Sequence, residues 1–306
     1  MTYKQLVESL IKEIESEGLL PWEIPWHSGE IRNIKGNAYR GMNSLLLGFY
    51  CRSRKFKSPY FLTRKQAREI GGDIKESELE RFFSVVFFNP ARIQYAKIQE
   101  DEIEPKDKED EKPTIKSGEW KIQKHSFLRV YSVYNVEQTE GINLSNFQNE
   151  KTKLKPVELA DHIVEGYKNR PQITAIHGKA YYNPIADIVC IPPLRDYDTT
   201  EAFYSTAFHE LIHSTGHKSR LNRIKSLAFF GSHDYSQEEL VAECGASFLL
   251  NMCNMLTVKE HRQSSAYLQS WLCKLREKTA LLWQSAAKAQ KAVDWILGRS
   301  YTESAK

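Results

Sequence analysis

The sequence His-Glu-Leu-Ile-His at residues 209–213 constrains this 306-residue chain more than any other feature. Residues four apart lie one above the other on the same face of an α-helix. His209 and His213 can therefore offer two imidazoles to one metal ion, with Glu210 one position further round the helix. Two histidine ligands and a glutamate general base are typical of zinc hydrolases. We predict a zinc site with His209 and His213 as ligands and Glu210 as the catalytic base. The alternative is a surface helix whose three polar side chains are only solvated.

Two histidines leave a zinc site one protein ligand short. The acidic segment 236–243 contains Glu239 and Glu243, which are four residues apart and share one helical face. A carboxylate ligand with an acidic residue one turn later is typical of the gluzincin class, in which the second acid accepts a hydrogen bond from a ligand histidine. We predict that Glu239 is the third ligand of one Zn²⁺ per chain and that Glu243 is its outer partner.

Two alternatives to this ligand set stay open. Ser236 followed by Glu239 also has the spacing of a capping box, and Glu243 would become the ligand if Glu239 capped its own helix. His217 lies four residues beyond His213 and would be a third ligand only if the motif helix continued past the intervening glycine.

The surroundings of the motif carry further expectations. We expect Glu238 to face the solvent and His233 to lie in a loop near the site. A zincin has a strand beside the motif helix that binds the substrate backbone by edge pairing, and segment 182–191 is the candidate for it.

Length and patterning predict two domains and an α+β fold. The chain is long enough for two domains of ordinary size. The polar segment 149–156 is the predicted linker between a mixed α/β domain, residues 1–150, and a zincin-like domain with a largely helical C-terminus, residues 151–306. Residues 100–118 are so rich in charge that we predict a flexible loop inside the first domain.

Composition also limits where the protein works. No window of eighteen apolar residues occurs, so no transmembrane helix and no membrane partner are expected. The five cysteines are scattered without a paired spacing, which is typical of reduced cysteines. The first residues indicate an amphipathic helix rather than a signal peptide, and we expect a cytoplasmic protein.

The net charge of +4 is unevenly distributed. Residues 31–68 contain ten basic residues, no acidic residue and six interleaved aromatic residues. Positive charge next to aromatic rings suits single-stranded nucleic acid, because phosphates are neutralised and unpaired bases stack. The alternative is a solvated basic face whose aromatic residues are buried elsewhere.

The chain resembles the ArdC-type antirestriction proteins of conjugative plasmids and related mobile elements. The matching pieces occur in one order over nearly the whole length: 18–26, 37–43, 63–67, 133–141, 182–187, 209–217, 219–223 and 238–243. Residues 73–78 and the loop at 100–118 depart from the family's pattern. The resemblance implies an N-terminal domain that binds single-stranded DNA without sequence preference and a C-terminal zincin-like metallopeptidase domain. It also implies protection of incoming unmodified DNA from host restriction.

With that resemblance, nine residues of the basic stretch are the candidates for contact with DNA: Arg32, Lys35, Tyr39, Arg40, Asn43, Arg52, Arg54, Lys55 and Lys57. The partners expected are single-stranded DNA and an unidentified protein substrate, such as a restriction subunit or a regulator bound to DNA. Two function classes remain. One is a DNA-binding zinc metallopeptidase, and the other is a non-enzymatic DNA-coating protein whose zinc site is structural.

Overall fold

The computed structural model of the chain describes most of its length. The described residues are 8, 11–12, 14–16, 18, 20, 30–97, 120–147, 154–224, 233–255, 265–277 and 280–299. The predicted charged loop at 100–118 and most of the predicted linker lie outside them. Among the described helices, none has the length and apolar character needed to cross a membrane.

The N-terminal half is built on a four-stranded sheet in the order β1-β2-β5-β4. Its strands are β1 (Arg32–Asn33), β2 (Tyr60–Leu62), β4 (Phe83–Lys97) and β5 (Trp120–Asn135). β1 runs parallel to β2, and β2 runs antiparallel to β5. Helix α2 (Met42–Ser53) connects β1 to β2 and buries nine of its twelve residues.

Short elements cover one end of this sheet. Helix α3 (Arg64–Glu69) begins with a capping box, in which the Thr63 side chain accepts from the Gln66 N–H and Gln66 returns a bond to the Thr63 N–H. β3 (Asp73–Ile74) pairs with β6 (Thr139–Glu140). The 3₁₀ turns η1 (Glu76–Glu78), η3 (Val136–Gln138) and η4 (Leu144–Phe147) flank these strands. Together they enclose a small apolar core formed by Leu62, Ala67, Ile74, Tyr134 and Val136.

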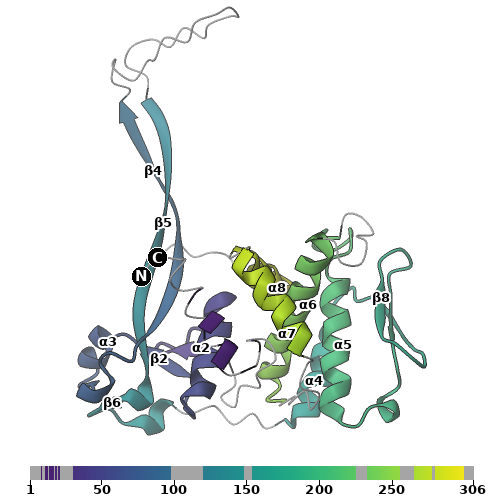
Figure 1. Cartoon of the computed structure of the whole chain (residues 1–306), viewed down its shortest axis with the longest axis horizontal. Helices are drawn as coiled ribbons and strands as arrows, with labels where there is room; N and C mark the ends of the chain where they lie inside the picture. The colour runs from purple at the N-terminus through teal and green to yellow at the C-terminus, as the bar shows by residue number, and fades with distance from the viewer. Residues whose placement is uncertain are drawn as a thin grey trace, which may run out of the picture. The chain divides into compact units, whose positions relative to one another are not determined.

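Strands β4 and β5 form a long twisted ribbon (Figure 1). The chain divides into two compact units, and the distal part of this ribbon, Val85–Tyr131, is separate from Met1–Ser84 and Ser132–Thr302. Phe87 and Tyr131 pack edge to face on the ribbon, with ring centroids 5.6 Å apart. The division of the chain at residue 150 stays a prediction.

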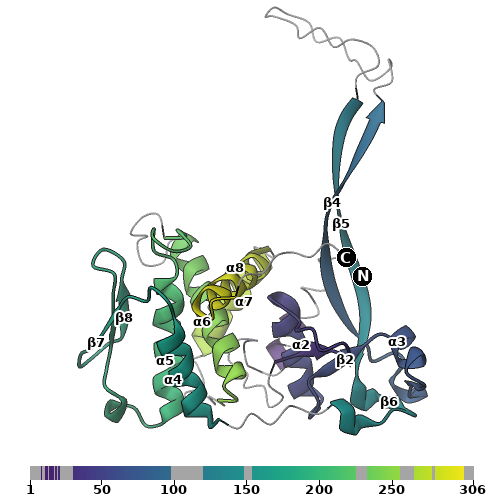
Figure 2. The ribbon, with the colours of Figure 1, turned by 180° about the vertical axis from the view of Figure 1, so that it is seen from behind.

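The C-terminal half contains a small sheet and five helices among the described residues. Strands β7 (Gln172–Ala175), β9 (Ile188–Ile191) and β8 (Tyr181–Asn183) form a sheet in the order β7-β9-β8. Figure 2 shows this sheet beside helix α5, which β8 and β9 contact. The helices are α4 (Pro156–Gly166), α5 (Thr200–Ser214), α6 (His233–Met252), α7 (Ser265–Glu277) and α8 (Ala280–Ile296). A sheet half followed by a mainly helical half confirms the predicted α+β class.

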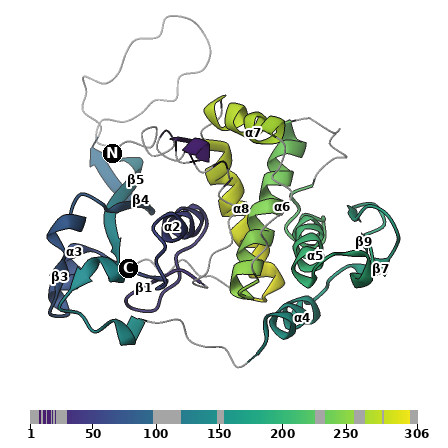
Figure 3. The same ribbon diagram turned by 60° about the horizontal axis from the view of Figure 1, so that its bottom comes forward.

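Helix α6 lies between α5 and α8 and packs along both (Figure 3). The contact with α5 is close because Gly245 of α6 has no side chain at the point where Ile212 of α5 enters. A β-carbon at Gly245 would lie 2.6 Å from Cδ1 and 2.8 Å from Cγ1 of Ile212, which is fully buried. The short separation of these two helices therefore depends on this glycine.

Replacing Gly245 by alanine is expected to destabilise the protein. Overpacking costs about 1–3 kcal/mol, whereas removing a glycine from a helix gains about 1 kcal/mol. We expect a net loss of about 1 kcal/mol in the free energy of unfolding, measured by urea titration followed by circular dichroism. Gly166 ends α4 with no atom within 4 Å of a β-carbon built on it, so Gly166→Ala is the matched control. Equal stability of the two variants would contradict the packing argument.

Candidate metal centre

The His-Glu-Leu-Ile-His motif forms the last turns of α5. The helix begins after Thr199, whose hydroxyl oxygen accepts a hydrogen bond of 3.1 Å from the Ala202 N–H. It ends at Ser214, so all five motif residues are helical. His209 and His213 share one face, as their spacing predicts, and their Nε2 atoms are 3.1 Å apart.

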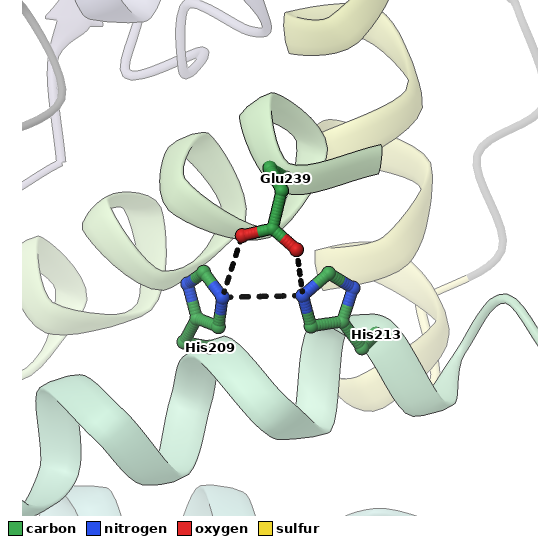
Figure 4. Close-up of side chains that lie close together, drawn as sticks. All are labelled: His209, His213 and Glu239. Atoms are coloured by element: carbon green, nitrogen blue, oxygen red, sulfur yellow. Dashed lines mark hydrogen bonds and ion pairs between the residues drawn. The ribbon is translucent and has the colours of Figure 1, made fainter. Parts of the chain in front are cut away.

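Glu239 of α6 completes a group of three possible metal-binding side chains (Figure 4). Its Oε2 lies 3.6 Å from Nε2 of His209, and its Oε1 lies 3.5 Å from Nε2 of His213. The ligand atoms offered by the three side chains all lie within 4.8 Å of one another. Helices α5 and α6 thus bring together the three residues that were predicted as ligands.

Two further carboxylates of α6 lie behind the histidines. Glu243 Oε1 is 3.9 Å from Nδ1 of His209, and Glu238 Oε1 is 3.4 Å from Nδ1 of His213. The expectation that Glu238 faces the solvent is wrong. Its side chain is only 19% exposed and forms an ion pair with Arg223, which the sequence pattern did not reveal.

The capping-box alternative for Glu239 is also wrong. Helix α6 begins at His233, so Ser236 and Glu239 lie inside the helix rather than at its N-cap, and His233 is not a loop residue.

The alternative of His217 as a third ligand is wrong as well. α5 does not continue to His217, and the Nδ1 atom of His217 lies 2.7 Å from the Ser219 hydroxyl instead. His217 is not a member of the three-residue group.

The electrostatics of the centre favour a bound cation. Burial by itself lowers the pKa of His213, but hydrogen bonds and negative charge from Glu238 and Glu239 raise it to about 10. Burial raises the pKa of Glu239, and the hydrogen bonds and positive charge of His209 and His213 lower it by more, to well below its ordinary value. When no metal ion is bound, the carboxylates therefore keep His213 protonated at neutral pH. The same negative charge would attract a metal cation.

Glu210 occupies a different position from the three grouped side chains. The residue is 8% exposed, and among the described residues it forms no hydrogen bond and no ion pair. Burial raises the pKa of the Tyr197 phenol, and the negative charge of Glu210 raises it further by a smaller amount. Among the described residues, Glu210 therefore has no evident role in holding the fold.

The turn between β8 and β9 is anchored to the end of α5. Arg220 forms a two-fold ion pair with Asp187, whose Oδ2 accepts from Nη1 at 3.0 Å. The Arg220 Nε also donates to the Ser214 carbonyl at 2.7 Å, and the Tyr182 hydroxyl donates to Asp187 at 2.8 Å. The Arg220 side chain is only 3% exposed. Through these bonds it joins the turn of the sheet to the end of the motif helix. β8 is one edge of that sheet and overlaps the start of segment 182–191, which was expected to pair with substrate, whereas β9, also in that segment, is the central strand.

The predicted DNA-contacting residues divide into two groups. Arg32 pairs with Glu30, Arg40 pairs with Asp294 of α8, and the Tyr39 ring packs edge-on against Phe61. Asn43 is half-buried in the first turn of α2. In the part of the chain that the structure describes, the remaining five form no ion pair: Lys35, Arg52, Arg54, Lys55 and Lys57. The last four cluster at the C-terminal end of α2.

Comparison with known families identifies the class of the second half. Residues 159–288 match the family described as zincin-like metallopeptidase. Residues 1–134 match the N-terminal domain of the anti-restriction factor ArdC. The chain therefore has the two-domain organisation of the ArdC-type antirestriction proteins, which confirms the resemblance and the predicted zincin-like fold.

Solved structures agree with this assignment over the whole chain. The metal-free crystal structure of the antirestriction protein ArdC from plasmid R388 is 29% identical and has a TM-score of 0.72, covering 96% of both chains. The Mn(II)-bound structure of that protein is 28% identical and has a TM-score of 0.70, covering 97% of both chains.

Curated relatives include larger proteins. Two proteins of Escherichia coli named DNA primase TraC are each 29% identical over 310 residues and 96% of this chain. The chain spans only 27% and 20% of the length of those two relatives. An uncharacterized protein of Sinorhizobium fredii is 27% identical over 96% of this chain and 91% of its own length.

The donor set of the centre fits a divalent metal ion. Two imidazoles and one carboxylate are the ligands of zinc peptidase sites, and imidazole also suits other first-row divalent ions. The Mn(II)-bound structure of the R388 protein supports a divalent ion for the zincin-like domain as well.

Replacing Asp187 by asparagine tests the anchor between sheet and motif helix. Asp187 has φ 53°, a conformation that asparagine also tolerates, so the loss of charge is the main change. Because Arg220 would lose its charged partner, we expect the free energy of unfolding at pH 7 to fall by about 2 kcal/mol, less than for a fully buried pair.

The effect of Asp187→Asn should also depend on pH. Burial raises the pKa of Asp187, while the hydrogen bonds from Arg220 and Tyr182 and the charge of Arg220 lower it by more. A carboxyl group with a lowered pKa in the folded state stabilises the fold above its unfolded pKa of about 3.9. The difference between wild type and variant should therefore be full at pH 7 and shrink as the pH falls below about 4. Urea titrations at several pH values measure it, and a difference that does not change with pH would contradict this assignment.

Proposed function

We propose that this protein is a DNA-binding zinc metallopeptidase that protects incoming unmodified DNA from host restriction. The observation that carries the peptidase part is the convergence of His209, His213 and Glu239, together with an unpartnered carboxylate at Glu210, next to His209 in the sequence. A purely structural metal site needs the three ligands but has no use for a fourth, unpartnered carboxylate on the motif helix.

Zinc is the proposed ion, at one per chain, held by Nε2 of His209, Nε2 of His213 and the carboxylate of Glu239. The chemistry that the ion supplies when bound is Lewis acidity for the attack of water on a peptide carbonyl. Glu243, whose Oε1 lies 3.9 Å from Nδ1 of His209, is the proposed outer partner of that imidazole.

Glu210 is the proposed general base. Its carboxylate accepts the proton of the attacking water and passes it to the nitrogen of the leaving amine as the peptide bond breaks. The absence of a hydrogen-bonding partner among the described residues leaves both carboxylate oxygens available for this transfer. Edge strand β8, fixed to the motif helix through Asp187 and Arg220, is the proposed element for pairing with the substrate backbone.

Replacing Glu210 by glutamine should abolish hydrolysis while the protein keeps its metal. The amide has nearly the same shape but cannot accept the proton, so a fall of at least about 100-fold in rate is expected. The measurement is cleavage of unfolded casein by zinc-loaded protein, with bound zinc determined by atomic absorption. His213→Ala is the matched variant and should lose both zinc and activity. A Glu210→Gln protein that cleaves casein at the wild-type rate would sink the proposed role.

The same variant separates enzymatic from non-enzymatic protection. Cells that produce wild type or Glu210→Gln protein receive unmodified DNA in the presence of a restriction enzyme, and surviving transformants are counted. Protection that needs Glu210 supports a peptidase acting on a protein of the restriction system or on a DNA-bound regulator. Full protection by the variant would instead favour coating of the DNA, the second function class.

Single-stranded DNA is the proposed nucleic-acid partner. The match of residues 1–134 to the N-terminal domain of ArdC supports DNA binding, as does similarity to segments of two DNA primases. The unpaired cations at the end of α2 suit contact with phosphates, and Arg54 lies over the ring of Tyr50 at 5.7 Å. Arg32 and Arg40 contribute less, because each already has a carboxylate partner.

Removing three of these cations should weaken DNA binding and its dependence on salt. Each phosphate contact on a single strand contributes about 0.7 to the slope of log K against log salt. For the variant Arg54→Gln, Lys55→Gln, Lys57→Gln we therefore expect a decrease of about 2 in that slope. Fluorescence anisotropy with a labelled single strand of about 30 nucleotides measures it. The control changes the same charge at exposed lysines of the second half, Lys168, Lys179 and Lys291. Equal effects of the two triple variants would contradict this DNA surface.

A further inference from the structure

Arg223 and Glu238 form an ion pair directly behind the motif histidine His213. The Arg223 Nη2 lies 2.8 Å from Glu238 Oε1, and its Nε lies 3.1 Å from Oε2, so both carboxylate oxygens are bound. The two side chains are 10% and 19% exposed. We infer that Arg223 and Glu238 are positioning residues that set the orientation of His213 and the position of Glu239. This inference rests on the metal centre that we propose above.

Glu238 acts on His213 through the ring nitrogen that faces away from the centre. Its Oε1 is 3.4 Å from Nδ1, whereas Nε2 faces His209 and Glu239. A carboxylate beside Nδ1 keeps a proton on that nitrogen, which leaves the lone pair of Nε2 free to bind a metal ion. The oxygen next to His213 is the one bound by Arg223 Nη2, so the arginine restricts where that carboxylate can lie.

Arg223 also fastens the end of the motif helix. Its Nη2 donates to the Ile212 carbonyl at 3.0 Å, and its Nη1 donates to the Thr215 hydroxyl at 2.7 Å. Ile212 and Thr215 flank His213 in the sequence, and Glu238 directly precedes Glu239. One guanidinium group therefore binds a backbone carbonyl before one proposed ligand, a side-chain hydroxyl after it, and the residue next to another proposed ligand.

The Arg220–Asp187 pair provides a matched comparison. Its arginine comes from the same segment after α5, is also buried, and also binds a backbone carbonyl at the end of that helix. The histidine nearest its carboxylate is His217, at 3.9 Å, which does not belong to the three-residue group. Loss of either pair removes an ion pair of a buried arginine, but only loss of Arg223–Glu238 removes a partner of a proposed ligand.

The experiment measures zinc affinity of the full chain by competition with a chromophoric chelator. Glu238→Gln keeps the shape of the side chain and removes its charge, and Arg223→Lys keeps the charge and removes the planar fork. We expect both variants to bind zinc about 10–100-fold more weakly than wild type. Asp187→Asn, the matched control, should bind zinc as tightly as wild type even though it is less stable.

A spectroscopic readout distinguishes orientation from stability. The visible absorption bands of the Co²⁺-loaded protein report the geometry of the ligands, and we expect them to shift in Glu238→Gln and Arg223→Lys but not in Asp187→Asn. Wild-type zinc affinity and an unchanged Co²⁺ spectrum in a folded Glu238→Gln or Arg223→Lys protein would overturn the inference, as would an equal loss of affinity in Asp187→Asn. If wild type itself binds neither ion, the proposed metal centre fails, and the inference fails with it.

Discussion

The close packing of α5 against α6 is the constraint on which the candidate site depends. Gly245 allows Ile212 to enter the surface of α6, and without a side chain at that position the two helices approach closely. This approach places Glu239 3.5–3.6 Å from the Nε2 atoms of His209 and His213. A site with ligands from two helices needs their separation to be fixed within a fraction of an ångström, and here a buried contact fixes it.

Two buried arginines extend this constraint to the surroundings of the site. Arg223 joins the end of α5 to Glu238 of α6, and Arg220 joins the same end of α5 to Asp187 of the β8–β9 turn. Buried guanidinium groups with two carboxylate contacts are geometrically demanding. They therefore define the position of the segment after α5 relative to both the second helix and the small sheet. The proposed ligands and the proposed substrate edge are held by neighbouring residues of one short segment.

Charge is organised differently in the two halves of the chain. In the second half, Glu238, Glu239 and Glu243 surround two histidines, and their combined charge favours a cation at the centre. In the first half, several cations of the basic stretch are already neutralised, including Arg32, Arg64 and Arg68. Among the described residues of this stretch that have no ion pair, four lie around the end of α2: Arg52, Arg54, Lys55 and Lys57. Proximity in sequence therefore identifies the region of positive charge, but pairing decides which of its members remain available to phosphates.

The sequence by itself determined the local part of the site. A spacing of four residues puts His209 and His213 on one helical face whatever surrounds the helix, and the α+β class follows from patterns that are equally local. It did not decide between a capping and an inward-facing role for Glu239, because both Ser232, directly before α6, and Ser236 are residue types that can begin a helix. Nor did it predict the burial of Glu238, since its partner Arg223 comes from a separate segment. Such contacts join residues distant along the chain, so only the tertiary structure decided which carboxylate meets the histidines and which one orients them.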